Sequence, residues 1–315
     1  MLQQQARILV IEDELGLKTS YFPGLAWNGM GYSFPTEKKN IPTKTNGKDQ
    51  ITFPVPDFLD NQTQKSDMGF IDINRTGKII SAKKILRDIS RHYESVNKDF
   101  SLVSDKFFLE SQANLHSNLL YLIAATDGNE DTVGHSQLVA RYSLLLTKAM
   151  GLEDRIFSAE IERGALLHDI GKIGIPDSIL RKAGPLTDKE REIIEEHPYL
   201  GYEMVEEFPF LHKASQVVLF HHESYDGLGY PYGLKGEEIP LEARIFTIAD
   251  TLDAITSDRS YRKGHSFRMA LDEIERVSGT QFDPTIVNAF LSVPEERWQQ
   301  IKAEMEQAHS MYSLH

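Results

Sequence analysis

Apolar residues recur at every third or fourth position over the last two thirds of the chain, which is the period of amphipathic α-helices. The pattern predicts a mainly helical protein with short polar connections. The expected helices cover residues 105–126, 131–149, 154–168, 188–207, 213–223, 241–257, 266–277, 284–291 and 294–309. Two boundaries carry capping signals, because Thr187 and Glu190 have the spacing of a capping box and Gly151 directly follows Met150.

The first hundred residues have a different composition and hydrophobic pattern. Residues 20–64 hold five prolines and four glycines and show no helical period, which is typical of loops and short strands. A strand is expected at residues 7–11, a hairpin at residues 68–80 that turns at residues 74–77, and a helix at residues 81–97. We therefore expect a small α+β sensory or capping domain of unknown ligand at residues 1–104 and an all-α helical bundle at residues 105–315.

The amino-acid composition excludes some kinds of metal site and binding partner. The 315 residues include no cysteine, which excludes disulfides and thiolate metal ligands. Residues 1–118 hold 15 Lys and Arg against 14 Asp and Glu, whereas residues 119–315 hold 19 against 33. Such an acidic segment is poorly suited to a nucleic-acid backbone, whose affinity depends on lysine and arginine. No apolar run approaches the roughly 18 residues of a membrane helix, so we expect a cytoplasmic protein with neither a nucleic-acid nor a membrane partner.

His135 shares the apolar face of the helix expected at residues 131–149 with Leu138, Val139 and Tyr142. Asp131 precedes it by one turn on the same face. An aspartate and a histidine four residues apart can bind one metal ion from a single helix. A hydrogen-bonded core histidine would give the same pattern, so this pair alone does not establish a metal site.

His168 and Asp169 follow an apolar run and precede two glycines that are expected to end the helix. Near a helix end both side chains can reach one metal cluster, where the carboxylate can bridge two cations. Lys172 adds a positive charge that can contact a phosphate or a departing oxyanion. The alternative is a buried ion pair that only caps the helix.

Three more histidines and an aspartate are placed to enter the core. His197 directly precedes Pro198, and His221 and His222 extend the apolar face of the helix before them. Asp250 lies in a helix so apolar that its carboxylate needs a cation as partner.

Together, five histidines and two or three aspartates without cysteine favour hard or borderline metals such as Fe, Mn, Mg, Ni or Zn. Their number exceeds a single tetrahedral site, so we expect two or more metal ions. Paired cations are suited to in-line phosphoryl displacement.

Three segments resemble a known family. HDIGK at residues 168–172, HHESYDGLGYPYGLKGEEIPLEARI at residues 221–245 and IADTLDAITSDRSYR at residues 248–262 are similar to the signature of HD-GYP domains, a branch of the HD phosphohydrolase superfamily. The resemblance covers about residues 110–290. It implies an all-α domain that hydrolyses cyclic di-GMP to pGpG or GMP with two or three divalent ions, iron or manganese being favoured.

The resemblance also implies roles for individual residues. Asp169 would bridge the metal ions, and Asp131 stands where some members have a glutamate and a third metal. Lys172 matches the lysine near the scissile phosphate, and Arg259 and Arg262 match basic positions that meet phosphates. The implied metal ligands are His135, His168, Asp169, His197, His221, His222 and Asp250.

The expected reaction is an attack on the phosphorus of a 3′,5′-phosphodiester by a hydroxide that bridges two metals, with His168, Asp169 and Lys172 as catalytic residues. The proton for the leaving group has no clear source in the sequence. Asp253, three residues after Asp250, can supply it or can orient a metal ligand from behind, and the second role is favoured.

The loop around GYP at residues 229–231 offers further contacts. Tyr225, which replaces the Trp common in the family, and Tyr230 can stack on guanine, while Gly229 permits a close backbone approach. The alternative is a rigid lid or a docking surface for a diguanylate cyclase (GGDEF) domain. The chain would then be a low-turnover sensor or adaptor. Cleavage of another cyclic dinucleotide and pairing into a homodimer are left open.

Overall fold

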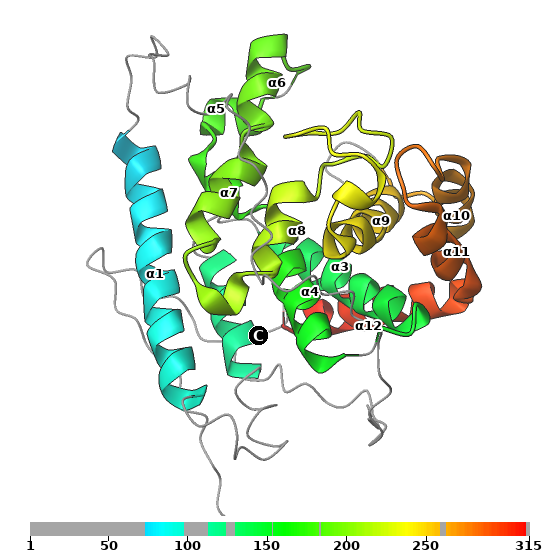
Figure 1. Ribbon diagram of the computed structural model, residues 1–315, viewed down its shortest axis with the longest axis horizontal. Coiled ribbons are helices and arrows are strands. Elements are labelled where there is room, and N and C mark those ends of the chain that lie inside the picture. Colours follow the sequence, from blue (N-terminus) through cyan, green and yellow to red (C-terminus); the bar gives the residue numbers. More distant parts are fainter. Residues whose placement is uncertain are drawn as a thin grey trace, which may run out of the picture. The chain divides into compact units, whose positions relative to one another are not determined.

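The computed structural model describes residues 73–97, 113–123, 130–152, 154–182, 184–258 and 263–312. They belong to one compact unit, Gln64–His315, and are mainly helical (Figure 1). Within them, β-structure is limited to two isolated bridges, and none of the helices has the length and apolar character to cross a membrane. Residues 113–123 are helical, and the labelled α-helices are α1 (Ile73–Asn97), α3 (Glu130–Ala149), α4 (Arg155–Leu167), α5 (Asp177–Leu180), α6 (Asp188–Ile194), α7 (His197–Val205), α8 (Ala214–Phe220), α9 (Leu241–Thr256), α10 (Phe267–Arg276), α11 (Pro284–Ser292) and α12 (Glu295–Tyr312). Short 3₁₀ helices occur at η3 (Ile170–Gly174), η4 (Pro209–Leu211) and η5 (Gly236–Glu238).

The mainly helical prediction is confirmed, and its local signals hold at two helix ends. The Thr187 hydroxyl accepts the N–H of Glu190 at 3.3 Å while the Glu190 carboxylate accepts the N–H of Thr187 at 2.8 Å, which completes the capping box of α6. Gly151 follows α3 with a φ of 73°, a left-handed conformation that favours glycine.

The hairpin expected at residues 68–80 is wrong over its described part, because helix α1 begins at Ile73. The local turn signal at residues 74–77 is overridden by packing: Ala82, Leu86 and Ile89 have helical spacing and are buried in the core. The strand expected at residues 7–11 and the rest of residues 1–72 lie outside the described residues, so an α+β domain there stays a prediction, as does a domain boundary at residue 104.

The single helix expected at residues 188–207 consists of two helices, α6 and α7. Proline explains the break, because Pro198 cannot donate the backbone hydrogen bond that a continuous helix requires. His197 therefore opens α7 instead of closing the helix before it. The His197 side chain therefore lies at the start of α7, a helix that packs against η3 and α8.

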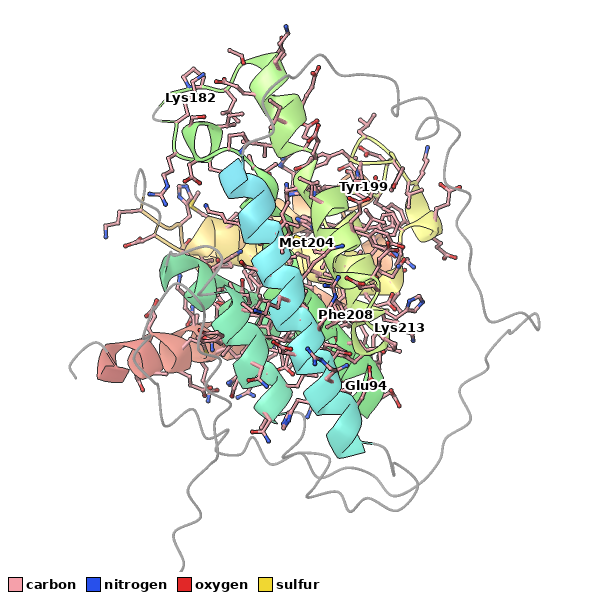
Figure 2. All side chains as sticks on the ribbon, turned by 90° about the vertical axis from the view of Figure 1, so that its left-hand side faces the viewer. Glu94, Lys182, Tyr199, Met204, Phe208 and Lys213 are labelled. Carbon is pink, nitrogen blue, oxygen red and sulfur yellow. The ribbon has the colours of Figure 1, made fainter. Side chains whose placement is uncertain are left out.

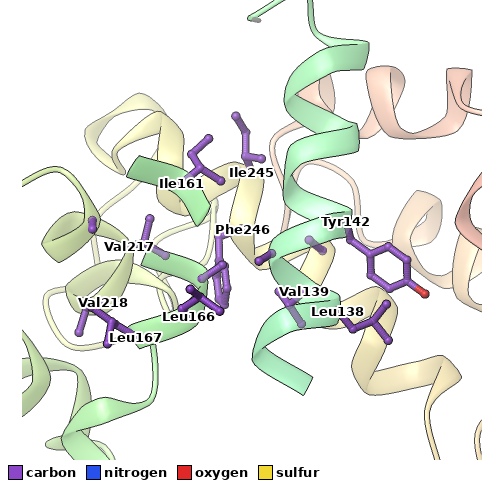
Figure 3. Close-up of a cluster of buried hydrophobic side chains, with 14 of the residues drawn as sticks. Leu138, Val139, Tyr142, Ile161, Leu166, Leu167, Val217, Val218, Ile245 and Phe246 are labelled. Atoms are coloured by element: carbon purple, nitrogen blue, oxygen red, sulfur yellow. The ribbon is translucent and has the colours of Figure 1, made fainter. Parts of the chain in front are cut away.

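Helices α3, α4, α8 and α9 form the centre of the core (Figure 3). Their buried apolar side chains include Leu138, Val139, Tyr142, Ile161, Leu166, Leu167, Val217, Val218, Ile245 and Phe246. Each such side chain contributes about 1.5–3 kcal/mol by leaving water. The same four helices carry histidines and aspartates toward one place, so the core fixes the geometry of the site.

Helix α1 packs along η3 and α7 (Figure 2). Ala82, Leu86 and Ile89 are buried, and they belong to the same core cluster as Met204 and Phe208, which Figure 2 labels. Because η3 directly follows Asp169, this contact supports the segment that presents the carboxylate.

Candidate metal centre

The sequence-predicted ligands converge from five separate helices. The structure brings them into two groups, and within each group the nitrogen and oxygen atoms that can bind a metal lie within 4.8 Å of one another. The first group is His135, His168 and Asp250, and the second is His197, His221 and His222. Each group offers three donor atoms that could hold a metal ion, and the number of ions stays a prediction.

Asp169 lies between the two groups. Its Oδ2 is 3.1 Å from Nε2 of His168, which belongs to the first group. Its Oδ1 is 3.3 Å from Nε2 of His197 and 3.9 Å from Nε2 of His221, which belong to the second. One carboxylate therefore offers one oxygen to each group, the arrangement that a bridging ligand requires.

Three of the histidines are oriented by the backbone. In each, Nδ1 lies within hydrogen-bond distance of the carbonyl oxygen three residues earlier and donates to it, so the Nε2 lone pair points into the centre. The pairs are His168 with Ala165 at 2.9 Å, His197 with Ile194 at 2.7 Å and His221 with Val218 at 2.9 Å.

The chemistry of the centre fits a cation. Nε2 of His197 lies 3.2 Å from Nε2 of His221, so two buried lone pairs face each other. Neither neutral ring can donate to the other while both Nδ1–H groups are bound to carbonyls. A divalent ion that accepts both lone pairs, together with nitrogen and carboxylate donors, satisfies this arrangement.

The ionisation states of His221, His222 and Asp169 favour metal binding. Burial, together with the positive charge of neighbouring histidines, holds the pKa of His221 well below its usual range and lowers that of His222 to about 4. Burial alone would raise the pKa of Asp169, but the charges of His168 and Lys172 outweigh it and hold that pKa well below its usual value. Neutral imidazoles and an ionised carboxylate are the forms that bind divalent cations.

His135 is held differently, because it lies inside α3. Its Nδ1 is 2.6 Å from Oδ2 of Asp253, and its Nε2 is 3.3 Å from Oδ1 of Asp250. Burial lowers the pKa of His135, but the hydrogen bonds and charges of Asp250 and Asp253 together raise it to about 10. Asp253, which is only 1% exposed, thus stands behind a predicted ligand, and its orienting role stays a prediction.

Two glycines permit the close approach of η3 to α7, and the sequence interpretation missed this role. A Cβ atom on Gly171 would lie 1.9 Å from the carbonyl oxygen of His197 and 2.5 Å from the backbone nitrogen of Gly201. The glycine in HDIGK was interpreted as the end of a helix. It also lets the backbone beside Asp169 touch the backbone that carries His197.

The GYP loop folds back on the histidines. A Cβ on Gly229 would lie 2.3 Å from the backbone nitrogen of Ser224, so only glycine fits there. The N–H of Tyr230 donates to the carbonyl of His222 at 3.1 Å, and the two rings stack at 4.6 Å with an interplanar angle of 23°. Gly229 and Tyr230 are therefore both beside the second ligand group.

Glu223 is a functional candidate that the sequence interpretation missed. It follows His221 and His222 directly, is only 3% exposed, and accepts the N–H groups of Tyr232 at 2.8 Å and Leu234 at 3.0 Å. It is the last residue of the helix expected at residues 213–223, and its place directly after two histidines was the available signal. It holds the far side of the GYP loop.

The remaining predicted residues divide into three cases. Lys172 lies at the centre, where its Nζ pairs with Oδ2 of Asp169 at 2.5 Å. The backbone of Tyr225 pairs with Gln281 and Gly236, which ties it to the loop before α11. Arg259, Arg262 and the side chain of Asp131 lie outside the described residues, so their roles stay predictions.

Comparison with known proteins agrees with this geometry. A family model described as HD domain matches residues 120–286, which is more than half of the chain. A cyclic di-GMP phosphodiesterase of Thermotoga maritima is 38% identical over 61% of this chain and 53% of its own length. The cyclic di-GMP phosphodiesterase response regulator RpfG of Xanthomonas campestris pv. campestris is 39% identical over 58% of this chain and 48% of its own.

A third relative, 3′3′-cGAMP-specific phosphodiesterase 2 of Vibrio cholerae, is 34% identical over 62% of this chain and 36% of its own length. The chain therefore spans about half the length, or less, of these three relatives. The family assignment rests on the matched helical segment and on the ligand motifs within it. The chain belongs to the HD-domain family, in its HD-GYP branch.

Proposed function

We propose that this chain hydrolyses the 3′,5′-phosphodiester bonds of cyclic di-GMP, to pGpG or GMP, at a centre of two or three divalent metal ions. The observation that carries the proposal is Asp169, whose two oxygens face two separate groups of ligands. The names of the Thermotoga and Xanthomonas relatives supply the substrate class.

The chain offers a complete set of metal-binding residues. His135, His168 and Asp250 would hold one ion, His197, His221 and His222 would hold the other, and Asp169 would bind both. When bound, a pair of divalent cations activates water at neutral pH and stabilises charge on both the attacking and leaving oxygens. Iron or manganese is the expected metal, and a third ion would require Asp131.

Lys172 would act on the substrate itself. Its ammonium group lies against Asp169, yet 36% of its side chain is exposed, so it can reach an anion that enters the centre. A fixed positive charge at this position would stabilise the charge that develops on the phosphoryl oxygens. His168 and Asp169 serve catalysis by holding the reacting centre in place.

Tyr230 would position the base. Its half-buried ring already stacks on His222, so its remaining edge and face can meet a planar guanine at the rim of the centre. We expect Arg259 and Arg262 to contact phosphates and Tyr225 to contact the second base.

Asp253 is better suited to orient His135 than to protonate a leaving group. It is 1% exposed, and its two oxygens accept hydrogen bonds from His135 and from Ser257. The leaving-group proton would therefore come from another group than Asp253.

The proposal is tested with protein purified without oxygen. Metal content per chain is measured, and products from cyclic di-GMP and from mixed cyclic GMP-AMP are followed. We expect two or three metals and conversion of cyclic di-GMP, and we expect His168→Ala/Asp169→Ala to lose metal and activity together. His212→Ala removes an exposed histidine on another part of the surface and serves as the matched control. Absence of metal, or bound metal with no hydrolysis of either nucleotide, would contradict the proposal.

Two other functions are alternatives. The Vibrio relative is named for cGAMP, so the mixed dinucleotide is the second candidate substrate. The other is a low-turnover sensor or adaptor that docks a diguanylate cyclase (GGDEF) domain through the GYP loop, where Leu228 is 86% exposed. A cytoplasmic location and a homodimer stay predictions, which fractionation and sedimentation would test.

A further inference from the structure

The C-terminal helix α12 reaches the end of α9 through one side chain. Nζ of Lys302 donates to the carbonyl oxygen of Thr256 at 2.6 Å and to Oγ of Ser257 at 3.1 Å. Thr256 is the last residue of α9, so its carbonyl has no partner within the helix and carries part of the negative end of the helix dipole. A lysine there stabilises the helix end.

The contact continues toward the metal centre. Oγ of Ser257 donates to Oδ1 of Asp253 at 2.5 Å, and Oδ2 of Asp253 lies 2.6 Å from Nδ1 of His135. Four residues thus form a continuous hydrogen-bonded path from α12 to a predicted metal ligand. Lys302 is at one end of this path and His135 at the other.

The direction of the path is fixed by chemistry. An ammonium group can only donate, so the Ser257 oxygen accepts from Lys302 and its own proton goes to Asp253. An ionised Asp253 can only accept, so it receives the Nδ1–H of His135. With Nδ1 held in this way, Nε2 of His135 is the nitrogen that faces Asp250 and His168, and it would bind a metal ion once its own proton is displaced.

We infer that Lys302 and Ser257 are positioning residues of the metal centre, which act on His135 through Asp253. The family model ends at residue 286, so Lys302 lies beyond the matched segment. The inference rests on the metal centre of the proposed function, but it does not depend on which nucleotide is cleaved.

A lysine that merely fastens α12 to the core would contribute stability and nothing else. The chain offers a matched control for that case. Arg141 of α3 pairs with Glu304 of α12 at 3.0 Å, which also ties α12 to the core but leads to neither Ser257 nor Asp253. Glu304→Gln removes the negative charge and so weakens this second tie, while Lys302, Ser257 and Asp253 stay unchanged.

The test uses the full chain after removal of metal. Titration with Mn²⁺ in a calorimeter gives the metal affinity, and urea unfolding gives the stability of each variant. Loss of a residue behind a metal ligand typically weakens affinity 10–100-fold, so we expect Lys302→Met and Ser257→Ala each to weaken Mn²⁺ binding by about tenfold. Lys302→Arg keeps donors for both acceptors and should retain the affinity. Glu304→Gln should lower the urea midpoint and leave the affinity unchanged.

Ser257→Ala keeps the bond between Lys302 and Thr256, so it tests the path even if Lys302→Met folds poorly. Because both residues act through Asp253, the variant with both Lys302→Met and Ser257→Ala should bind Mn²⁺ no more weakly than either single variant. Wild-type Mn²⁺ affinity in Ser257→Ala, or equal losses in Glu304→Gln and Lys302→Met, would overturn the inference. Weakened Mn²⁺ binding in protein that cleaves neither nucleotide would support the inference while the proposed function fails.

Discussion

The contact between η3 and α7 gives a prediction whose size follows from the coordinates. In Gly171→Ala the new Cβ would lie 1.9 Å from the carbonyl oxygen of His197, whereas ordinary contact begins at 3.4 Å. The two backbones must therefore separate by about 1.5 Å at this point, and backbone atoms cannot turn aside as a side chain can. The same two segments hold Asp169 and His197, whose ligand atoms are 3.3 Å apart.

Two effects are expected. Overpacking a core typically costs about 1–3 kcal/mol when side chains can adjust, so we expect at least about 3 kcal/mol less free energy of unfolding for Gly171→Ala. Separation of Asp169 from His197 also divides the bridging ligand from the second group. Since a shift of about 1 Å at reacting groups can cost 100-fold in rate, Mn²⁺ affinity and turnover should both fall at least tenfold.

The assay is a graded series of glycine-to-alanine variants. Gly184→Ala adds a Cβ in open space, and Gly201→Ala adds one that lies 2.8 Å from a methyl group of Val218 and 3.1 Å from the nitrogen of Gly171. Urea midpoints and Mn²⁺ affinities should fall in the order Gly184→Ala, Gly201→Ala, Gly171→Ala. If Gly171→Ala matches Gly184→Ala in both measurements, the close contact does not set the geometry of the centre and the reasoning is refuted.

Two further predictions concern buried ionisable groups. Glu223→Gln places an amide N–H against a backbone N–H of the GYP loop, so we expect the free energy of unfolding to fall by about 1–3 kcal/mol. We also expect a higher KM for the dinucleotide and an unchanged Mn²⁺ affinity. An unchanged KM would contradict a role for Glu223 in holding the loop. The pKa of His135 rises on folding from 6.5 to about 10, so its stabilisation of metal-free protein is complete below pH 6.5 and is lost as pH approaches 10. Urea unfolding from pH 7 to 10 should show this decline, and His135→Gln should not.

Most of the ligand set could be predicted from sequence because each residue type conflicts with its surroundings. His221, His222 and Asp250 occur on apolar helix faces where a charge or an unpaired polar group is costly, and the structure places all three in the two ligand groups. Helix ends could also be predicted where the sequence carries a capping signal, as at Thr187.

What could not be predicted depends on contacts between distant segments. Gly171 meets Gly201 and Lys302 meets Thr256, and no spacing rule along one helix contains either pair. The hairpin expected at residues 68–80 failed for a related reason: a turn signal at residues 74–77 is weaker than the burial of an entire face of α1. Local preferences are small compared with packing, so tertiary structure decides such cases.

The positions of these ligands within their helices explain why His135, unlike His168, His197 and His221, needs a path of side chains. The carbonyls that orient His168, His197 and His221 lie in the last turns of α4, α6 and α8, where a helix has no partners of its own for them. His135 lies inside α3, where the carbonyls three and four residues earlier belong to the helix. A carboxylate must take their place, and a buried carboxylate must itself be held. The position of His135 inside a helix therefore explains why Asp253 is needed to orient it, and why Ser257 and Lys302 are needed to hold Asp253.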